Sequence, residues 1–148
     1  GLSKLFLPQM LERKNGKILN VASTAAFQPG PFMALYYASK AFVLFFSEAI
    51  ASELKGTGVT VTALCPGPTS TGFAERAKLG GTKLMGGKIM GPEQVALEGF
   101  NGLMKGKAIV IPGAKNRALA FVVRLLPRSF VTGYVRGLQE KRFRKQNS

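Results

Sequence analysis

The 148-residue chain contains no histidine and no aspartate, and it has only one cysteine. Without histidine, Ser-His-Asp hydrolysis and histidine-based metal sites are excluded. The seven glutamates are too widely spaced to predict a carboxylate metal cluster, so we expect no metal site. A single cysteine cannot form an internal disulfide and suits a reducing compartment, and Cys65 is expected to be a small core residue at a strand end.

Several other signatures are missing. The sequence has no Gly-x-Ser-x-Gly elbow and no Walker phosphate loop. It has no uninterrupted apolar run of membrane-spanning length, and its first residues do not form a secretory signal. With 46% hydrophobic and 19% charged residues and no low-complexity tract, the composition predicts one folded domain. We therefore expect a cytoplasmic protein.

Negative charge is scarce. Lysine and arginine number 21 against seven acidic residues, which gives a net charge of +14. Such a charge would suit nucleic acid, but no aromatic residues alternate with the basic ones and no known binding motif is present. Nucleic acid is therefore an unlikely partner on this pattern.

The order of apolar patterns predicts an α/β fold. Helical periodicity covers residues 2–14, and Pro8 is expected to kink that helix. The other predicted elements are a strand over 16–23, a helix over 37–55 closed by a Gly-Thr-Gly turn, a buried strand over 59–65, a helix over 92–104 and a short strand over 108–111. Alternating strands and helices of this kind are typical of parallel sheets.

Three residues stand out as candidates for catalysis. Ser23 ends a predicted strand, where open α/β sheets carry their sites. Tyr36 and Lys40 are four residues apart, so on a helix they share one face. A free phenol has a pKa near 10, so a phenol that works near neutral pH needs a positive charge beside it, which Lys40 could supply. Tyr37 is followed four residues later by Ala41, which makes Tyr36 the better candidate.

Each of these residues alone has an ordinary structural explanation. A serine at a strand end usually caps a turn, a tyrosine at a helix start usually packs, and a lysine on a helix is usually solvated. The Tyr-x-x-x-Lys spacing is also a weak motif by itself. Only the combined placement of Ser23, Tyr36 and Lys40 favours proton transfer at a carbonyl group.

In this combination the chain resembles the short-chain dehydrogenase/reductase family. The matching features are Ser23 at the end of one strand, the Tyr36–Lys40 helix, and the Pro66-Gly67 loop after the next strand, over residues 1 to about 114. The resemblance implies a partial Rossmann-like, doubly wound parallel sheet, equivalent to the last three strands of a seven-stranded sheet with their helices. We accordingly divide the chain into residues 1–114, half of a Rossmann-type domain, and a basic amphipathic tail, 115–148.

The resemblance also implies a reaction and a cofactor. Members interconvert an alcohol and a carbonyl by hydride transfer with NAD or NADP, so a small-molecule alcohol or carbonyl compound is the expected substrate. Carried over, Tyr36 exchanges the proton, Ser23 hydrogen-bonds the substrate oxygen, and Lys40 binds the nicotinamide ribose. The loop residues matching the nicotinamide side of the cofactor site are Pro66, Gly67, Thr69 and Thr71.

The sequence departs from the family pattern in one serious respect. The Gly-rich dinucleotide fingerprint, the residue that selects NAD or NADP, and an Asn-Asn-Ala-Gly stretch should precede the Ser23 strand, and none is present. The adenine and pyrophosphate sites are therefore expected to be missing. The alternative prediction is a truncated, non-catalytic fragment that self-associates, since three parallel strands also leave a sheet edge unpaired.

Three segments leave alternatives open. The helix over 37–55 is apolar on most of its circumference, which indicates either packing within the chain or a subunit contact. The family implies the second, a homo-oligomer paired through a four-helix bundle. Residues 72–91 are either a solvated connector or, as the family implies, a lid carrying Phe73, Leu79, Leu84 or Met85.

The third segment is the tail from residue 115, which holds nine of the 21 basic residues and one acidic residue, Glu140. Its apolar stretches are interrupted by Pro127 and flanked by arginines. Such a segment either packs on the protein's own core or lies on an anionic membrane surface as a peripheral attachment. Nucleic acid binding is the least supported of the three interpretations.

Overall fold

The computed structural model describes residues 2–69 and 90–146. In chain order the elements are α1 (Leu2–Glu12), β1 (Gly16–Val21), the short 3-10 helix η1 (Thr24–Phe27), α2 (Ala34–Glu53), β2 (Val59–Leu64), α4 (Pro92–Met104), β3 (Ile109–Val110), α5 (Ala114–Leu125) and α6 (Arg128–Gln146). Every predicted strand and helix is present, with ends that differ by a few residues. The main difference is that α2 begins at Ala34, so Tyr36 lies inside its first turn.

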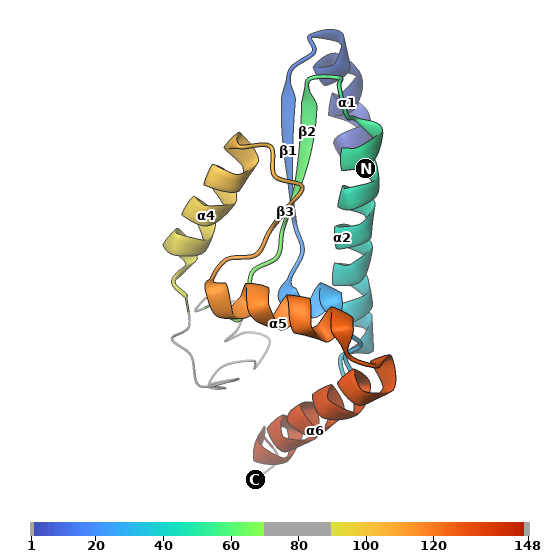
Figure 1. Ribbon diagram of the computed structural model, residues 1–148, viewed down its shortest axis with the longest axis vertical. Helices are drawn as coiled ribbons and strands as arrows, with labels where there is room; N and C mark the ends of the chain where they lie inside the picture. The colour runs from blue at the N-terminus through green and yellow to red at the C-terminus, as the bar shows by residue number, and fades with distance from the viewer. Residues whose placement is uncertain (1, 70–89, 147–148) are drawn as a thin grey trace.

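The three strands form one parallel sheet in the order β1-β2-β3. Gly16 pairs with Val59 and Val21 with Leu64, so β1 and β2 run in register along their whole length. Because all strands are parallel, their carboxyl ends lie together, at the lower end of the sheet in Figure 1. At the same end lie η1, the start of α2 and helix α5.

Helices cover both faces of the sheet. α1 and α2 lie on one face and α4 on the other (Figure 1). On the α2 side Leu44 packs with Ala63 and Cys65, and on the α4 side Leu64 packs with Val95 and Val110. β2, between the other two strands, is almost wholly buried, as its β-branched sequence predicts. The partial doubly wound α/β architecture is thus confirmed.

Helix α2 is attached to the sheet by a partly buried polar contact. The Ser47 hydroxyl, which has no exposed surface, accepts a hydrogen bond from Asn20 Nδ2 at 2.9 Å. The same hydroxyl donates to the Val43 carbonyl of its own helix at 2.7 Å. Because a buried hydroxyl without partners would cost stability, this pair defines how α2 sits on β1.

The opposite side of α2 is exposed and apolar. Phe42, Phe45 and Phe46 are 67%, 63% and 41% exposed, and the Phe42 and Phe46 rings stack at 5.7 Å. By length and composition alone this 20-residue helix could cross a membrane, contrary to our expectation from the sequence. The core helix of a soluble protein passes the same test, and α2 packs against β2 on its inner side.

The basic tail forms two helices that pack on the rest of the chain in part. Ala120 of α5 is buried, as are Val131, Val135 and Gln139 of α6, which recur every four residues. α5 contacts η1 across the carboxyl end of the sheet (Figure 1). The packing interpretation of the tail therefore holds for one face of each helix. The division at residue 114 stays a prediction.

The Thr62 hydroxyl provides a test of this packing. Thr62 is fully buried in β2, and its Oγ1 has no hydrogen-bond partner among the described residues. Thr62→Val keeps the side-chain shape and removes an unsatisfied polar atom, so we expect the free energy of unfolding to rise by about 1 kcal/mol. Urea denaturation measures the change.

The matched control is Thr57→Val. Thr57 Oγ1 donates to the Leu54 carbonyl at 2.7 Å and accepts from the Val59 amide at 3.2 Å. Losing these bonds should lower the free energy of unfolding by about 1 kcal/mol. A fall of similar size in both variants would show that the Thr62 hydroxyl is satisfied after all.

Candidate active site

Ser23 lies where β1 ends and the chain turns into η1. Its extended backbone makes it the amino-terminal cap of η1, and its Oγ accepts a hydrogen bond from the Ala25 amide at 3.1 Å. The hydroxyl proton points to the Pro66 carbonyl over a long 3.5 Å. Ser23 thus does cap a turn, but its proton is only weakly held and could be donated elsewhere.

Tyr36 and Lys40 lie one turn apart at the start of α2, as their spacing predicts. The Lys40 Nζ is 5.9 Å from the centre of the Tyr36 ring and donates a hydrogen bond to the Val21 carbonyl at 3.3 Å. Val21 is the last residue of β1, two positions before Ser23. Lys40 therefore connects the face of α2 that carries Tyr36 to the end of β1, the strand that leads to Ser23.

The loop after β2 lies beside Ser23. The Thr24 amide donates to the Pro66 carbonyl at 2.9 Å, so this loop and the start of η1 are directly joined. The Thr69 hydroxyl donates to the Gly67 carbonyl at 3.0 Å, and Thr69 forms a bridge with Met90. Pro66, Gly67 and Thr69 thus lie at the carboxyl end of the sheet, whereas Thr71 and the proposed lid residues Phe73, Leu79, Leu84 and Met85 lie outside the described residues.

Asn116 at the start of α5 is a site neighbour that the sequence analysis missed. Its amide donates to the Pro112 carbonyl at 2.7 Å, which holds the side chain against the Pro66-Gly67 loop. A Cβ built on Gly67 would lie 2.5 Å from Asn116 Nδ2, so only glycine fits there without movement. No local pattern connects these two residues, because they are far apart in the sequence.

A second missed contact ties α6 to the start of α2. The Tyr37 hydroxyl accepts a hydrogen bond from the Gln139 amide at 3.1 Å, and Gln139 is only 3% exposed. The Tyr37 ring lies so close to Gly30 that a Cβ on Gly30 would overlap it. Tyr37 is therefore a packing residue, while the Tyr36 ring, nearly perpendicular to it, lies beside Lys40.

The loop before α2 contains a strained residue. Phe32 has a φ of 66°, which is unusual for a bulky side chain. The guanidinium of Arg136 in α6 lies 5.9 Å from the centre of the Phe32 ring. The contact from α6 thus supports the loop that leads into α2, the helix that carries Tyr36.

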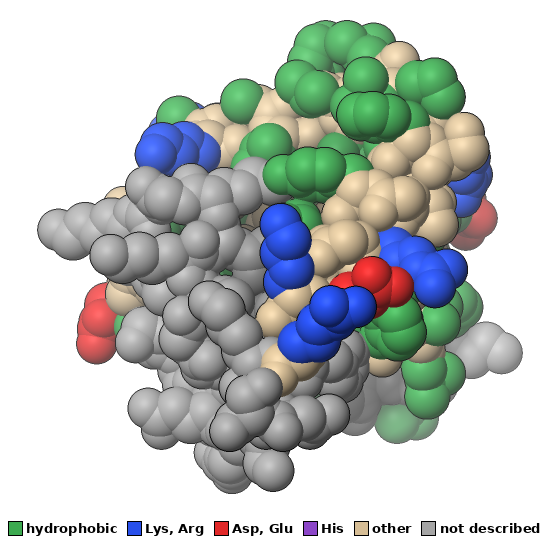
Figure 2. All heavy atoms as spheres, turned by 90° about the horizontal axis from the view of Figure 1, so that it is seen from below, with side chains coloured by type: hydrophobic (Ala, Val, Ile, Leu, Met, Phe, Trp, Pro, Cys, Tyr) green, Lys and Arg blue, Asp and Glu red, His purple; other side chains and the backbone are tan. Residues whose placement is uncertain are grey.

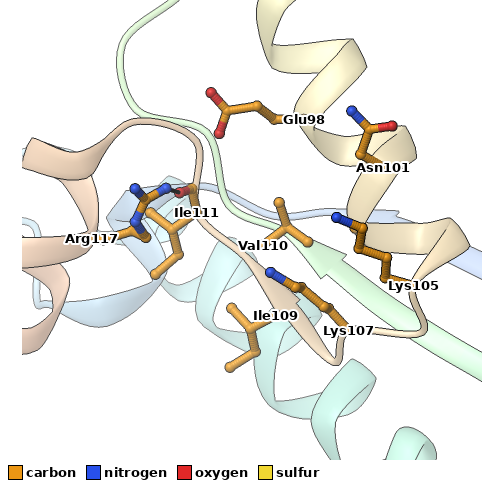
Figure 3. A pocket seen from close by; sticks show the side chains of 9 residues that line it. Glu98, Asn101, Lys105, Lys107, Ile109, Val110, Ile111 and Arg117 are labelled. Atoms are coloured by element: carbon orange, nitrogen blue, oxygen red, sulfur yellow. Dashed lines mark hydrogen bonds between the residues drawn. The ribbon is translucent and has the colours of Figure 1, made fainter.

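Two surface hollows lie away from this cluster. One, of about 220 Å³, lies between α4 and β3 and is bordered by Glu98, Lys105, Lys107 and Arg117 (Figure 3). Arg117 donates a hydrogen bond to the Ile111 carbonyl at 3.3 Å, and Glu98 accepts one from the Gly113 amide at 3.4 Å. The second hollow, of about 550 Å³, lies near Lys55 and Gly106, where β2 begins. Neither hollow is lined by Ser23, Tyr36 or Lys40. The candidate site is therefore identified by the kinds of side chain that it brings together and not by a cavity.

The comparison with known proteins identifies the fold family. The family described as short chain dehydrogenase matches residues 1–80, more than half of the chain. The chain belongs to the short-chain dehydrogenase family. The ketoacyl reductase HetN of Nostoc sp. is 41% identical over 96 residues, which cover 64% of this chain and 33% of that protein. Estradiol 17-beta-dehydrogenase 11 of Macaca fascicularis is 32% identical over 132 residues, which cover 87% of this chain and 42% of that protein.

Solved structures of the family agree with the fold. A 7beta-hydroxysteroid dehydrogenase is similar with a TM-score of 0.75 at 27% identity, covering 89% of this chain and 52% of that one. A short-chain dehydrogenase from Sphingobium yanoikuyae in complex with NADPH has a TM-score of 0.67 at 27% identity, covering 90% of this chain and 48% of that one. The chain thus spans half or less of the length of most of these relatives, while it shares their dehydrogenase and reductase family.

Cys65 offers a test of burial at the strand end next to the site. Burial raises the pKa of the Cys65 thiol from 9.0 to about 11; the Ser23 backbone opposes the rise and Glu48 adds to it. The unfolded thiol ionises near pH 9 and the folded one near pH 11, so stability from the neutral thiol is complete below pH 9 and is lost as the pH rises to 11. We expect that loss to be about 2 kcal/mol.

The measurement is the free energy of unfolding of the native chain and of Cys65→Ala across pH 8 to 11. Other groups also titrate in this range, but they are common to both proteins. As the pH rises, the free energy of unfolding of the native chain should fall by about 2 kcal/mol more than that of Cys65→Ala. A difference that stays constant over the whole range would contradict the burial of a neutral thiol.

Proposed function

We propose that this chain forms the catalytic half of an NAD(P)-dependent oxidoreductase that interconverts an alcohol and a carbonyl group. The observation that carries the proposal is the placement of Tyr36 and Lys40 on one face of α2, joined by Lys40 to the end of the strand that leads to Ser23. Membership of the short-chain dehydrogenase family supports the same assignment.

In the proposed mechanism, the Tyr36 phenol gives its proton to the carbonyl oxygen during reduction and takes it back during oxidation. The positive charge of Lys40, 5.9 Å from the ring centre, stabilises the phenolate that forms. The Ser23 hydroxyl, whose present bond to Pro66 is long, hydrogen-bonds the substrate oxygen and holds it near Tyr36. These roles use a phenol, an ammonium and a hydroxyl, and they need no histidine.

The chain's residues fit one side of a nicotinamide cofactor. Lys40 can donate to ribose hydroxyls, and the Pro66-Gly67 loop, kept close by Asn116, offers backbone groups beside it. Thr69 belongs to the same loop, and we extend the proposal to Thr71. When bound, the nicotinamide supplies or accepts the hydride. The glycine-rich adenine and pyrophosphate motifs are not in this sequence, so the choice between NAD and NADP would be made outside it.

The names of the relatives favour an apolar small-molecule substrate. They include a ketoacyl reductase, a very-long-chain 3-oxoacyl-CoA reductase and an estradiol dehydrogenase. The compounds in these names carry a ketone or a secondary alcohol, and two of them, the very long acyl chain and the steroid, have an apolar carbon skeleton. We propose a substrate of that general class, without a choice between acyl chains and steroids.

A second property is supported by a separate observation. The exposed side of α2, with Phe42, Phe45 and Phe46, and the exposed Leu5 and Phe6 of α1 belong to the two helices on the same face of the sheet. Large apolar patches on a protein surface mark interaction sites. We propose that this surface pairs two copies of the chain in a homo-oligomer.

The catalytic proposal predicts the effect of Tyr36→Phe in a full-length enzyme that carries this segment. Loss of the proton donor should lower kcat by about 10²- to 10⁴-fold, with little change in thermal stability. Steady-state kinetics with a ketone substrate and NADPH or NADH make the measurement. Turnover equal to that of the unmodified enzyme would remove Tyr36 from the mechanism.

Tyr37→Phe is the matched control. It removes the neighbouring phenol, which contacts Gln139. We expect a loss of about 1 kcal/mol in stability and a kcat near that of the unmodified enzyme. If Tyr37→Phe reduced kcat as strongly as Tyr36→Phe, the chemistry could not be assigned to Tyr36.

The pairing proposal predicts that Phe45→Glu weakens self-association at least about 30-fold, because an interface hot spot contributes about 2 kcal/mol or more. Light scattering over a dilution series measures it. The control is Phe100→Glu on α4, since Phe100 is 57% exposed and Phe45 is 63% exposed. This control should not change self-association. Equal self-association of the native chain, Phe45→Glu and Phe100→Glu would mean that α2 does not form the contact between copies.

A further inference from the structure

Helix α5 has two opposite faces that are both apolar. One face turns inward, where Ala120 is 7% exposed and Asn116 contacts the Gly67 loop. On the other side Phe121, Val122 and Leu125 are 63%, 46% and 70% exposed. Leu125 follows Phe121 by four residues and Val122 by three, so it is a surface neighbour of both and the three lie on one side of the helix. Core packing explains the first face and leaves the second unexplained.

Helix α6 also has an exposed apolar side. Val131 and Val135, 5% and 3% exposed, form the buried side of that helix, whereas Phe130 and Tyr134 are 61% and 52% exposed. We call the exposed set the outer face. It consists of Phe121, Val122, Leu125, Leu126, Phe130 and Tyr134.

The charge along α5 and the start of α6 has one sign. Lys115, Arg117, Arg124 and Arg128 are all exposed and lie along α5 and the start of α6. The sequence has no acidic residue between Glu98 and Glu140. Figure 2, which views the end of the molecule where these helices lie, shows hydrophobic side chains with lysine and arginine side chains beside them, and an acidic side chain between basic ones near the centre of the view. The surface therefore combines apolar contact area with a cationic border.

We propose that the outer face docks on an anionic lipid bilayer, with α5 lying in the plane of the interface. Aromatic and leucine side chains would enter the boundary between head groups and acyl chains, and the arginines would reach the lipid phosphates. Each basic residue near an anionic leaflet strengthens binding roughly fivefold. The cationic border and the apolar centre thus act on the same partner.

Other occupants fit this surface less well. A second copy of the chain would bring a cationic border against a cationic border, in a molecule of net charge +14. Nucleic acid would satisfy the arginines but would leave Phe121 and Leu125 against a polar backbone. Lipid is the partner that has negative charge at its surface and an apolar interior directly below.

Docking has a consequence for the oxidoreductase proposed above, and this step alone rests on that proposal. Asn116, on the inner side of α5, touches the Gly67 loop, so the helix that carries part of the outer face also contacts the candidate site. A docked enzyme would hold the carboxyl end of its sheet near the bilayer. An apolar ketone or alcohol could then reach the site from the lipid phase.

The chain contains no tryptophan, so a single introduced one reports on its own position. The experiment uses the 148-residue chain with Phe121→Trp on the outer face and, as a control, Phe100→Trp on α4, which is exposed to a similar extent at 57%. Circular dichroism checks that both variants keep their helices. Each is titrated with vesicles of phosphatidylcholine and phosphatidylserine, with and without brominated acyl chains, and with phosphatidylcholine alone.

We expect Phe121→Trp to shift its emission to the blue and to be quenched by brominated lipid only with the anionic vesicles. Phe100→Trp should change in neither respect. Adding Arg117→Gln and Arg124→Gln to Phe121→Trp should weaken binding about 25-fold, and raising the salt from 0.05 to 0.5 M should weaken it further. No enzymatic activity is needed, so failure of docking and failure of the catalytic proposal are separate results.

Three outcomes would overturn the proposal. The first is an equal response of both tryptophans, which would indicate adsorption without orientation. The second is an unquenched Phe121→Trp with anionic vesicles. The third is a blue shift that appears on concentration without lipid, which would assign the outer face to a second copy of the chain.

Discussion

The position of α2 on the sheet is the constraint on which the candidate site depends. Asn20 of β1 and Ser47 of α2 form a partly buried hydrogen bond, and Leu44, 1% exposed, packs one turn away. A slip of the helix by one residue would break this bond and leave the Asn20 amide without its Ser47 partner, at a cost of about 1–3 kcal/mol. Because Tyr36 and Lys40 are on the same helix, this contact also determines how far they lie from Ser23.

The tail completes the site from outside the family-matched region. Asn116 of α5 packs on Gly67, and Gln139 of α6 holds the Tyr37 ring next to Tyr36. The first contact supports the loop after β2, and the second supports the start of α2. The carboxyl-terminal helices are thus part of the support of the site, although they lie beyond residues 1–80 that match the family.

What the sequence could predict follows from the range of the interactions. Strands and helices were found because their apolar periods are local, and the Tyr36–Lys40 pair because four residues make one helical turn. The contacts of Asn116 with Gly67 and of Gln139 with Tyr37 were not found, since no local pattern specifies which distant residues meet. The start of α2 was placed too late, because Met33 caps the helix without any side-chain bond that a sequence pattern could show.

The two exposed apolar surfaces differ in their charge, and the difference separates their proposed partners. The α2 surface has both Glu48 and Glu53 along its helix as well as Lys40 and Lys55 near its ends, so two copies can approach without strong repulsion. Along α5 and the start of α6 the charged residues beside the outer face are lysine and arginine. Further along α6, Arg136 forms an ion pair with Glu140 at 2.9 Å. Apolar area by itself would suit either a protein or a lipid partner. The sign of the surrounding charge is the reason why we propose self-pairing for α2 and an anionic bilayer for α5.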